Sequence, residues 1–218
     1  MKIRFFLKEK KTKVAIKMVD QPDVRFLGVV KSCSELTEEM QRIADSLLDD
    51  LFNIWKERYE SLFQKENNCE FRYESMKWLK MKSFKLLDEK RIKMEKLKMS
   101  ITAVCIFLGQ EKSFWINTGS EMVYAYDENN GFFRKLTSNK KKLASAKEQS
   151  IFSISNNYVE NMEGFVIDTP KAIYIVSAEV KLFFENCINS GLAISRKDFN
   201  TISQGQKKPI FIGEIYGN

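Results

Sequence analysis

Two long helical patterns, set between two strand-rich blocks, constrain the fold of this chain most. Between residues 36 and 62, apolar residues recur every three or four positions, which predicts a helix with one continuous apolar stripe. Ser32 and Glu35 have the spacing of a capping box, which predicts the start of this helix. A second helix is expected over residues 73–98, a stretch without proline or glycine.

Strand patterns flank the two helices on both sides. Residues 14–19 and 24–30 are rich in β-branched and aromatic side chains and are separated by a turn signal that contains Pro22. After the helices, strands are expected at 101–108, 113–117, 122–126, 151–155, 172–176 and 210–215, with shorter helices over 179–189 and near Ser195. This order predicts an α+β fold in which antiparallel sheets and helices are segregated. With 44% hydrophobic residues, the chain can bury a large core, and we expect residues 1–218 to form a single domain.

The composition excludes several classes of site. The chain has no histidine, which removes Ser-His and Cys-His nucleophiles and every metal site that needs an imidazole. Its four cysteines lie far apart and form no CxxC pair, so we expect no zinc knuckle and infer a reducing compartment, the cytoplasm or the nucleus. No apolar run reaches 18 residues, so no transmembrane segment is expected. Lysines from Lys8 onward interrupt the apolar N-terminus too early for a signal peptide.

Six short segments occur in an order that suggests a family. They are FLGVVKS at 26–32, SITAV at 100–104, NTGSEMVY at 117–124, LTSNK at 136–140, AIYIVSAEV at 172–180 and QKKPIFI at 206–212. In this order, and with two long helices between the first and the second, they resemble the type 2C metal-dependent serine/threonine protein phosphatases, the PPM family. The resemblance covers nearly the whole chain. It implies a four-layer α-β-β-α sandwich, in which two antiparallel sheets are flanked by helix pairs.

The resemblance also implies that the chemistry of the family has been lost. In the family, aspartates at strand ends bind two Mg²⁺ or Mn²⁺ ions, which activate a water molecule toward a phosphate ester. Lys31, followed by Ser32, stands at the family's Asp-Gly, and Ala178, followed by Glu179, stands in its Ser-Asp-Gly. Lys207 or Lys208 replaces the last aspartate, and Ser120 replaces the aspartate of a Gly-Asp-Ser motif.

These replacements remove the anionic ligands that hard cations need, and they put positive charge in their place. The early acidic motif of the family is also missing, since Glu9 stands alone among lysines. The resemblance therefore implies no catalytic residue, no metal ligand and no cofactor.

Three of the replacement residues raise the possibility of anion binding. Lys31, Lys207 and Lys208 could hold a phosphorylated side chain, because an ammonium binds phosphate as a point charge. No arginine fork stands near them in the sequence, which favours the simpler interpretation of solvated lysines at loop ends.

The second helix carries most of the excess charge of the chain. From Lys77 to Lys98 there are nine lysines and arginines against three acidic residues, which is +6 of the net +7. Such a face could bind nucleic acid or an anionic membrane surface. The same segment has an ordinary apolar stripe that includes Leu79, Leu86 and Ile92, and this favours a solvated outer helix instead.

The leading hypothesis is a catalytically inactive relative of the type 2C phosphatases, a pseudophosphatase and not an enzyme. It would act as a protein-binding regulator or scaffold in phosphorylation signalling, with a kinase or a phosphoprotein as partner. One alternative is a weak or divergent phosphohydrolase whose single metal ion is held by carboxylates such as Asp168 or Glu179. The other is a basic module that binds nucleic acid or a membrane surface.

Overall fold

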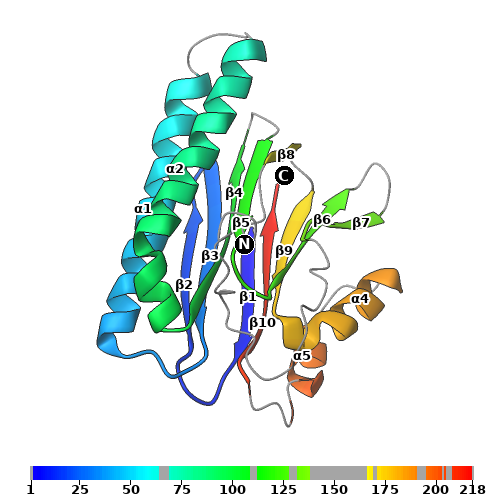
Figure 1. The fold of residues 1–218 in the computed structure, drawn as a ribbon. Helices are drawn as coiled ribbons and strands as arrows, with labels where there is room; N and C mark the ends of the chain where they lie inside the picture. The colour runs from blue at the N-terminus through cyan, green and yellow to red at the C-terminus, as the bar shows by residue number, and fades with distance from the viewer. Residues whose placement is uncertain are drawn as a thin grey trace, which may run out of the picture.

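Two stacked antiparallel sheets lie between two layers of helices (Figure 1). The computed structural model describes residues 2–63, 69–108, 112–127, 132–137, 166–168, 171–190, 195–202, 204 and 208–217. Within these residues every strand pair is antiparallel, and each sheet has five strands. The predicted α+β class and the four-layer arrangement are therefore confirmed. No helix in the described part of the chain is long and apolar enough to cross a membrane.

The first sheet is covered by the long helix pair. Its strand order is β2 (Val14–Asp20), β3 (Val24–Ser32), β4 (Met99–Phe107), β5 (Lys112–Asn117) and β8 (Val166–Asp168). Every residue of β3 and β4 is buried, because one face of these strands packs on helices and the other on the second sheet. The helices α1 (Glu38–Phe63) and α2 (Cys69–Lys96) form the outer layer on this side.

The second sheet carries the shorter helices. Its strand order is β1 (Ile3–Lys8), β10 (Ile210–Tyr216), β9 (Ala172–Val176), β6 (Met122–Asp127) and β7 (Phe132–Lys135). A single 3-10 turn, η1 (Ala178–Val180), follows β9 and leads into α4 (Lys181–Asn189), after which comes α5 (Arg196–Ile202). The helices α4 and α5 form the fourth layer and pack on this sheet through Phe184 and Phe199.

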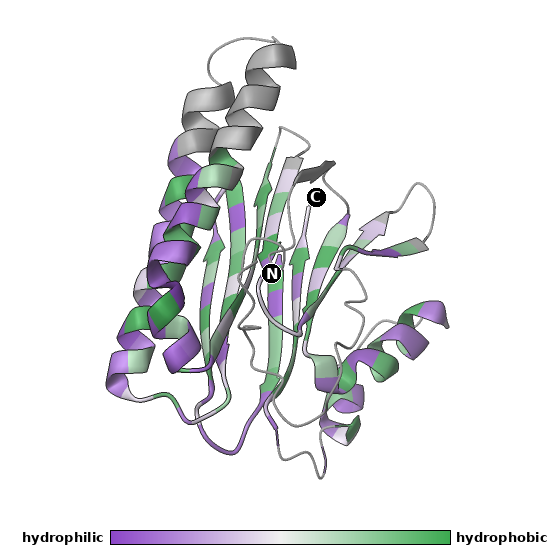
Figure 2. Cartoon of the chain, in the orientation of Figure 1, coloured by the Kyte–Doolittle hydropathy of each residue, from purple (hydrophilic) through white to green (hydrophobic). Residues whose placement is uncertain are grey.

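The apolar residues separate into three cores, one at each boundary between layers. Trp55 lies at the centre of the core under α1 and α2, where its ring meets those of Phe26 and Phe114, and its indole N–H donates to Ser83 Oγ at 2.8 Å. A second core fills the space between the sheets, and a third lies under α4 and α5. Figure 2 shows hydrophilic residues in purple over much of the α1–α2 pair and apolar residues in green along the strands.

The structure corrects the apolar stripe that was expected on the second helix. Leu79 and Leu86 do face the core, but Ile92 is 72% exposed. Met94, two residues later, is fully buried instead. Because successive residues of a helix are about 100° apart, a position two residues away from the stripe faces the opposite side. The outer face of α2 therefore presents Ile92 and Met81 among its lysines.

The start of the first helix is also corrected. Ser32 is the last residue of β3, paired with Met99, so it does not cap a helix. The helix begins at Glu38, and the hydroxyl of Thr37 accepts a hydrogen bond from the backbone N–H of Met40 at 3.3 Å. The strands β7 and β8 were not predicted, and the strand expected at 151–155 lies outside the described residues.

Candidate functional site

The side chain of Lys31 points from β3 into the space between the two sheets. Side chains of a strand alternate between its faces. Phe26 and Val30 belong to the core under the helices, whereas Leu27 and Val29 belong to the core between the sheets. Lys31 continues the second series, so its position in the strand directs a charged group toward the second sheet.

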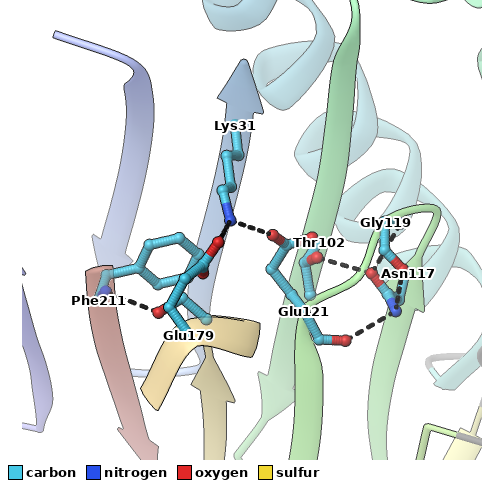
Figure 3. A network of polar contacts seen from close by, with 8 residues as sticks. Lys31, Thr102, Asn117, Gly119, Glu121, Glu179 and Phe211 are labelled. Atoms are coloured by element: carbon cyan, nitrogen blue, oxygen red, sulfur yellow. Dashed lines mark hydrogen bonds and ion pairs between the residues drawn. The ribbon is translucent and has the colours of Figure 1, made fainter. Parts of the chain in front are cut away.

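The ammonium of Lys31 lies between two carboxylates of the second sheet (Figure 3). Its Nζ is 3.2 Å from Glu121 Oε1, 3.1 Å from Glu179 Oε2 and 3.3 Å from Glu179 Oε1. Glu121 immediately precedes β6, and Glu179 lies in η1, which Ser177 separates from the end of β9. The exposed fraction of the side chain is 10% for Lys31, 2% for Glu121 and 16% for Glu179. The three charges thus meet at one end of the sandwich, largely shielded from water.

The loop before β6 is held by the amide of Asn117. Its Oδ1 accepts hydrogen bonds from the Thr102 hydroxyl at 2.8 Å and from the Gly119 N–H at 3.0 Å (Figure 3). Its Nδ2 donates to the carbonyl of Glu121 at 3.0 Å. A Cβ at Gly119 would overlap Glu121 Oε2 and approach Ser100 Oγ to 2.7 Å, so only glycine leaves room for the carboxylate. These contacts fix the position from which Glu121 reaches Lys31.

The second carboxylate is positioned through Ser177, which is fully buried at the end of β9. Its hydroxyl accepts a hydrogen bond from the Phe211 N–H at 3.0 Å, and its own N–H donates to the Phe211 carbonyl at 3.0 Å. The Ser177 carbonyl in turn accepts from the N–H of Val180 at 3.1 Å, which closes the turn that contains Glu179. Neighbouring β10 therefore anchors the start of η1.

The electrostatics of the site favour a charged lysine. Burial lowers the pKa of the Lys31 ammonium, but the negative charges of Glu121 and Glu179 together outweigh burial, so that this pKa is raised above its usual value. Within the described residues, neither carboxylate oxygen of Glu121 accepts a hydrogen bond. Among the residues that the structure describes, the ion pair with Lys31 therefore offsets the cost of burying the negative charge of Glu121.

The structure brings together two of the residues that the sequence singled out, Lys31 and Glu179, and adds Glu121, which the sequence analysis missed. The signal for Glu121 was an acidic residue directly after Ser120, the position compared with the family's aspartate. Ser120 itself is exposed at the turn.

The remaining residues of interest lie around this cluster or apart from it. Ala178 is half-buried beside Glu179, and the Ser32 hydroxyl accepts from the Ser34 N–H at 3.2 Å. Lys208 is exposed, and Lys207 lies outside the described residues. Anion binding at Lys31 and these two lysines stays a prediction, in which an anion would compete with the two carboxylates for Lys31.

The residues of the cluster do not fit a dinuclear Mg²⁺ or Mn²⁺ centre. Mg²⁺, for example, takes oxygen ligands in octahedral geometry at about 2.0–2.1 Å. Here two carboxylates converge, and the ammonium of Lys31 lies against both of them, in the position that a metal ion would need. In the part of the chain that the structure describes, no group of three or more acidic or cysteine side chains is arranged to hold a metal ion.

Solved structures with the same arrangement of layers are serine and serine/threonine phosphatases. The serine/threonine phosphatase of S. agalactiae superposes with a TM-score of 0.59 at 11% identity, covering 99% of this chain and 100% of that one. A bacterial serine phosphatase superposes at 0.54 with 14% identity, covering 100% and 99%. The chain has the fold of the PPM phosphatases.

A third structure with the PPM fold, RsbX in complex with magnesium, superposes with a TM-score of 0.57 at 8% identity, covering 99% of this chain and 94% of that one. No family model and no curated protein matches the sequence. Identities this low show a shared fold, and the activity has to be argued from the residues of this chain.

Proposed function

We propose that this chain is a PPM-fold pseudophosphatase, which acts by binding another protein in a phosphorylation pathway instead of hydrolysing phosphate esters. The observation that carries the proposal is the position of the Lys31 ammonium between Glu121 and Glu179. In a metal-dependent phosphatase, the cation lowers the pKa of a bound water and holds it near the phosphorus. A primary ammonium carries one charge, donates hydrogen bonds and has no open coordination position for such a water.

Hydrolysis without a metal ion would need a nucleophile and a general base, and the residues near the cluster suit neither role. A candidate nucleophile, the hydroxyl of Ser177, is fully buried and accepts the N–H of Phe211. A general base would have to be a carboxylate, because the chain has no histidine. Glu121 and Glu179 both lie against the ammonium of Lys31, so their oxygens are directed toward a cation and not toward a water molecule.

Turnover is the direct test of the proposal. The purified chain is assayed with p-nitrophenyl phosphate and with phosphoserine and phosphothreonine peptides, in EDTA, in MgCl₂ and in MnCl₂. An active PPM phosphatase serves as the positive control. We expect no turnover that depends on metal and no heat of Mn²⁺ binding in calorimetry. Metal-dependent hydrolysis by the unmodified chain would overturn the proposal and favour the divergent phosphohydrolase.

The binding role is tested separately, with matched pairs of phosphorylated and unphosphorylated peptides. A regulator of phosphorylation signalling that recognises a phosphoprotein should bind the phosphorylated member of a pair more tightly and leave its phosphate intact. Equal binding of both members would count against a phosphoprotein partner. Binding to duplex DNA or anionic vesicles that weakens steeply with salt would instead support the basic-module alternative, through the outer face of α2.

A further inference from the structure

The ion pairs of Lys31 join the two sheets at one end of the sandwich. Lys31 belongs to the sheet covered by α1 and α2, whereas Glu121 and Glu179 flank strands of the other sheet. Three carboxylate oxygens lie 3.1–3.3 Å from Nζ. A positive centre held against carboxylate oxygens at 3.1–3.3 Å is an arrangement that a bound cation would also produce, although here the oxygens come from one sheet and the positive charge from the other.

The two carboxylates need a cation between them. Glu121 is 2% exposed, and neither of its oxygens accepts a hydrogen bond from the described residues. Two carboxylates at one site repel each other, and a positive charge between them offsets that repulsion. The surrounding backbone nevertheless presents both of them, since Asn117 and Gly119 shape one loop and Ser177 the other.

We propose that the Lys31 ammonium, tethered to β3, substitutes for a divalent cation. The ammonium joins the two sheets through its ion pairs with Glu121 and Glu179, and its removal leaves a site that a divalent cation can bind. The inference rests on the proposed function in one respect, because both require the unmodified site to be closed to metal. It adds a structural role for the cluster and names the ion class that the cluster would accept.

The decisive variant is Lys31→Asp, which replaces the ammonium by a third carboxylate. Urea unfolding is measured in EDTA and at increasing MnCl₂ concentrations, and Mn²⁺ binding is followed by the loss of the free-ion signal in electron paramagnetic resonance. The unmodified chain should unfold at the same urea concentration with and without Mn²⁺. The variant should unfold earlier in EDTA and gain stability with Mn²⁺. At ten times the dissociation constant, its folded-to-unfolded ratio should rise about elevenfold.

The matched control is Lys17→Asp on neighbouring β2. Lys17 is ion-paired with Asp49, whose side chain is 54% exposed, so the substitution makes the same change of charge at a more exposed place with a single carboxylate neighbour. This control should show no comparable gain with Mn²⁺. Adding Glu121→Gln to Lys31→Asp should remove most of the gain, because the glutamine supplies one neutral oxygen where a charged ligand stood.

Lys31→Ala decides the matter if Lys31→Asp fails to fold in either condition. This variant keeps the two glutamates and removes only the ammonium, so a gain with Mn²⁺ that Glu121→Gln abolishes supports the proposal. Unfolding of both Lys31 variants that is indifferent to Mn²⁺, with no binding in the resonance measurement, overturns it and leaves the proposed function standing. Metal-dependent turnover by the unmodified chain overturns the proposed function, and Glu121-dependent Mn²⁺ binding by the unmodified chain overturns both.

Discussion

Replacing Lys31 by methionine should destabilise the fold far more than a surface charge would. Methionine keeps most of the length of the side chain and removes only the ammonium. Glu121 then stays 2% exposed and loses its ion-pair partner. Removing one partner of a buried ion pair costs about 3–5 kcal/mol, because the remaining charge is buried without compensation. Since Glu179 is 16% exposed and can gain water, we expect a cost near the lower end, about 3 kcal/mol.

The origin of this cost can be isolated with a double-mutant cycle. Glu121→Gln leaves Lys31 paired with Glu179, so it should cost less than Lys31→Met. Once the carboxylate is neutral, losing the ammonium no longer leaves a buried charge at Glu121. The double variant should therefore be more stable than the sum of the two single costs predicts, by about 1–3 kcal/mol.

The assay is equilibrium unfolding in urea, followed by the fluorescence of the buried Trp55 and Trp115. Lys17→Met is the control, since Asp49 is mostly exposed and such pairs contribute about 1 kcal/mol or less. If Lys31→Met costs no more than this control, and the cycle is additive within about 0.5 kcal/mol, the reasoning about a buried, charge-compensated Glu121 is refuted.

Three further predictions concern the cores and the alkaline limit. Ser83→Ala removes the acceptor of the buried Trp55 indole N–H and should lower the free energy of unfolding by about 1–3 kcal/mol. Ser83→Thr keeps a hydroxyl and should cost less, so equal costs for the two variants would contradict the hydrogen-bond argument. Gly28→Ala places a Cβ 2.5 Å from Leu48 Cδ2 and should cost about 1–3 kcal/mol in the same urea assay, and a urea midpoint equal to that of the unmodified chain would contradict the close packing of α1 on β3. Burial, followed by the nearby Glu214, raises the pKa of Tyr216 to about 12, so the folded state favours the neutral phenol. This contribution to stability is complete below the unfolded pKa of about 10 and is lost as the pH rises toward 12. The urea midpoint should therefore fall between pH 9 and pH 11.5, and Tyr216→Phe should reduce that fall; an identical slope in the variant would count against it.

The sequence predicted those elements whose patterns are set by a large buried surface. The strand at 172–176 was predicted with its observed bounds, because β-branched and aromatic residues fill it and its two faces meet two cores. The helix start was missed because Ser32 and Thr37 are both good caps in isolation. Ser32 pairs with Met99 of β4, and this pairing keeps the backbone extended through Ser32. Such a tertiary contact is not encoded in the local spacing of residues. The strands β7 and β8 have four and three residues, too few to establish a period.

The candidate site was predicted only in part, for a similar reason. Comparison with the family's motifs drew attention to Lys31 and Glu179, each at the end of a strand pattern. They are 148 residues apart in the sequence, and their ion pair exists because two sheets stack face to face. Glu121 escaped notice because its neighbour Ser120 occupies the compared position, and the turn that Asn117 holds directs the carboxylate inward.

Under the proposed function, the cluster suggests how a chain with this fold can keep its shape without a metal ion. A divalent ion at such a place does two things, since it balances the charge of the carboxylates and it activates water. An ammonium can take over the first task, because balancing charge requires only a cation within hydrogen-bond distance of the oxygens. It cannot take over the second, because it has no vacant coordination position and one charge less. If Lys31 acts in this way, the two tasks are separable in this fold, and stability and turnover should respond independently to substitutions in the cluster. A variant that regains Mn²⁺-dependent stability without regaining hydrolysis would be the clearest sign of that separation, since the remaining ligands that orient the attacking water would still be missing.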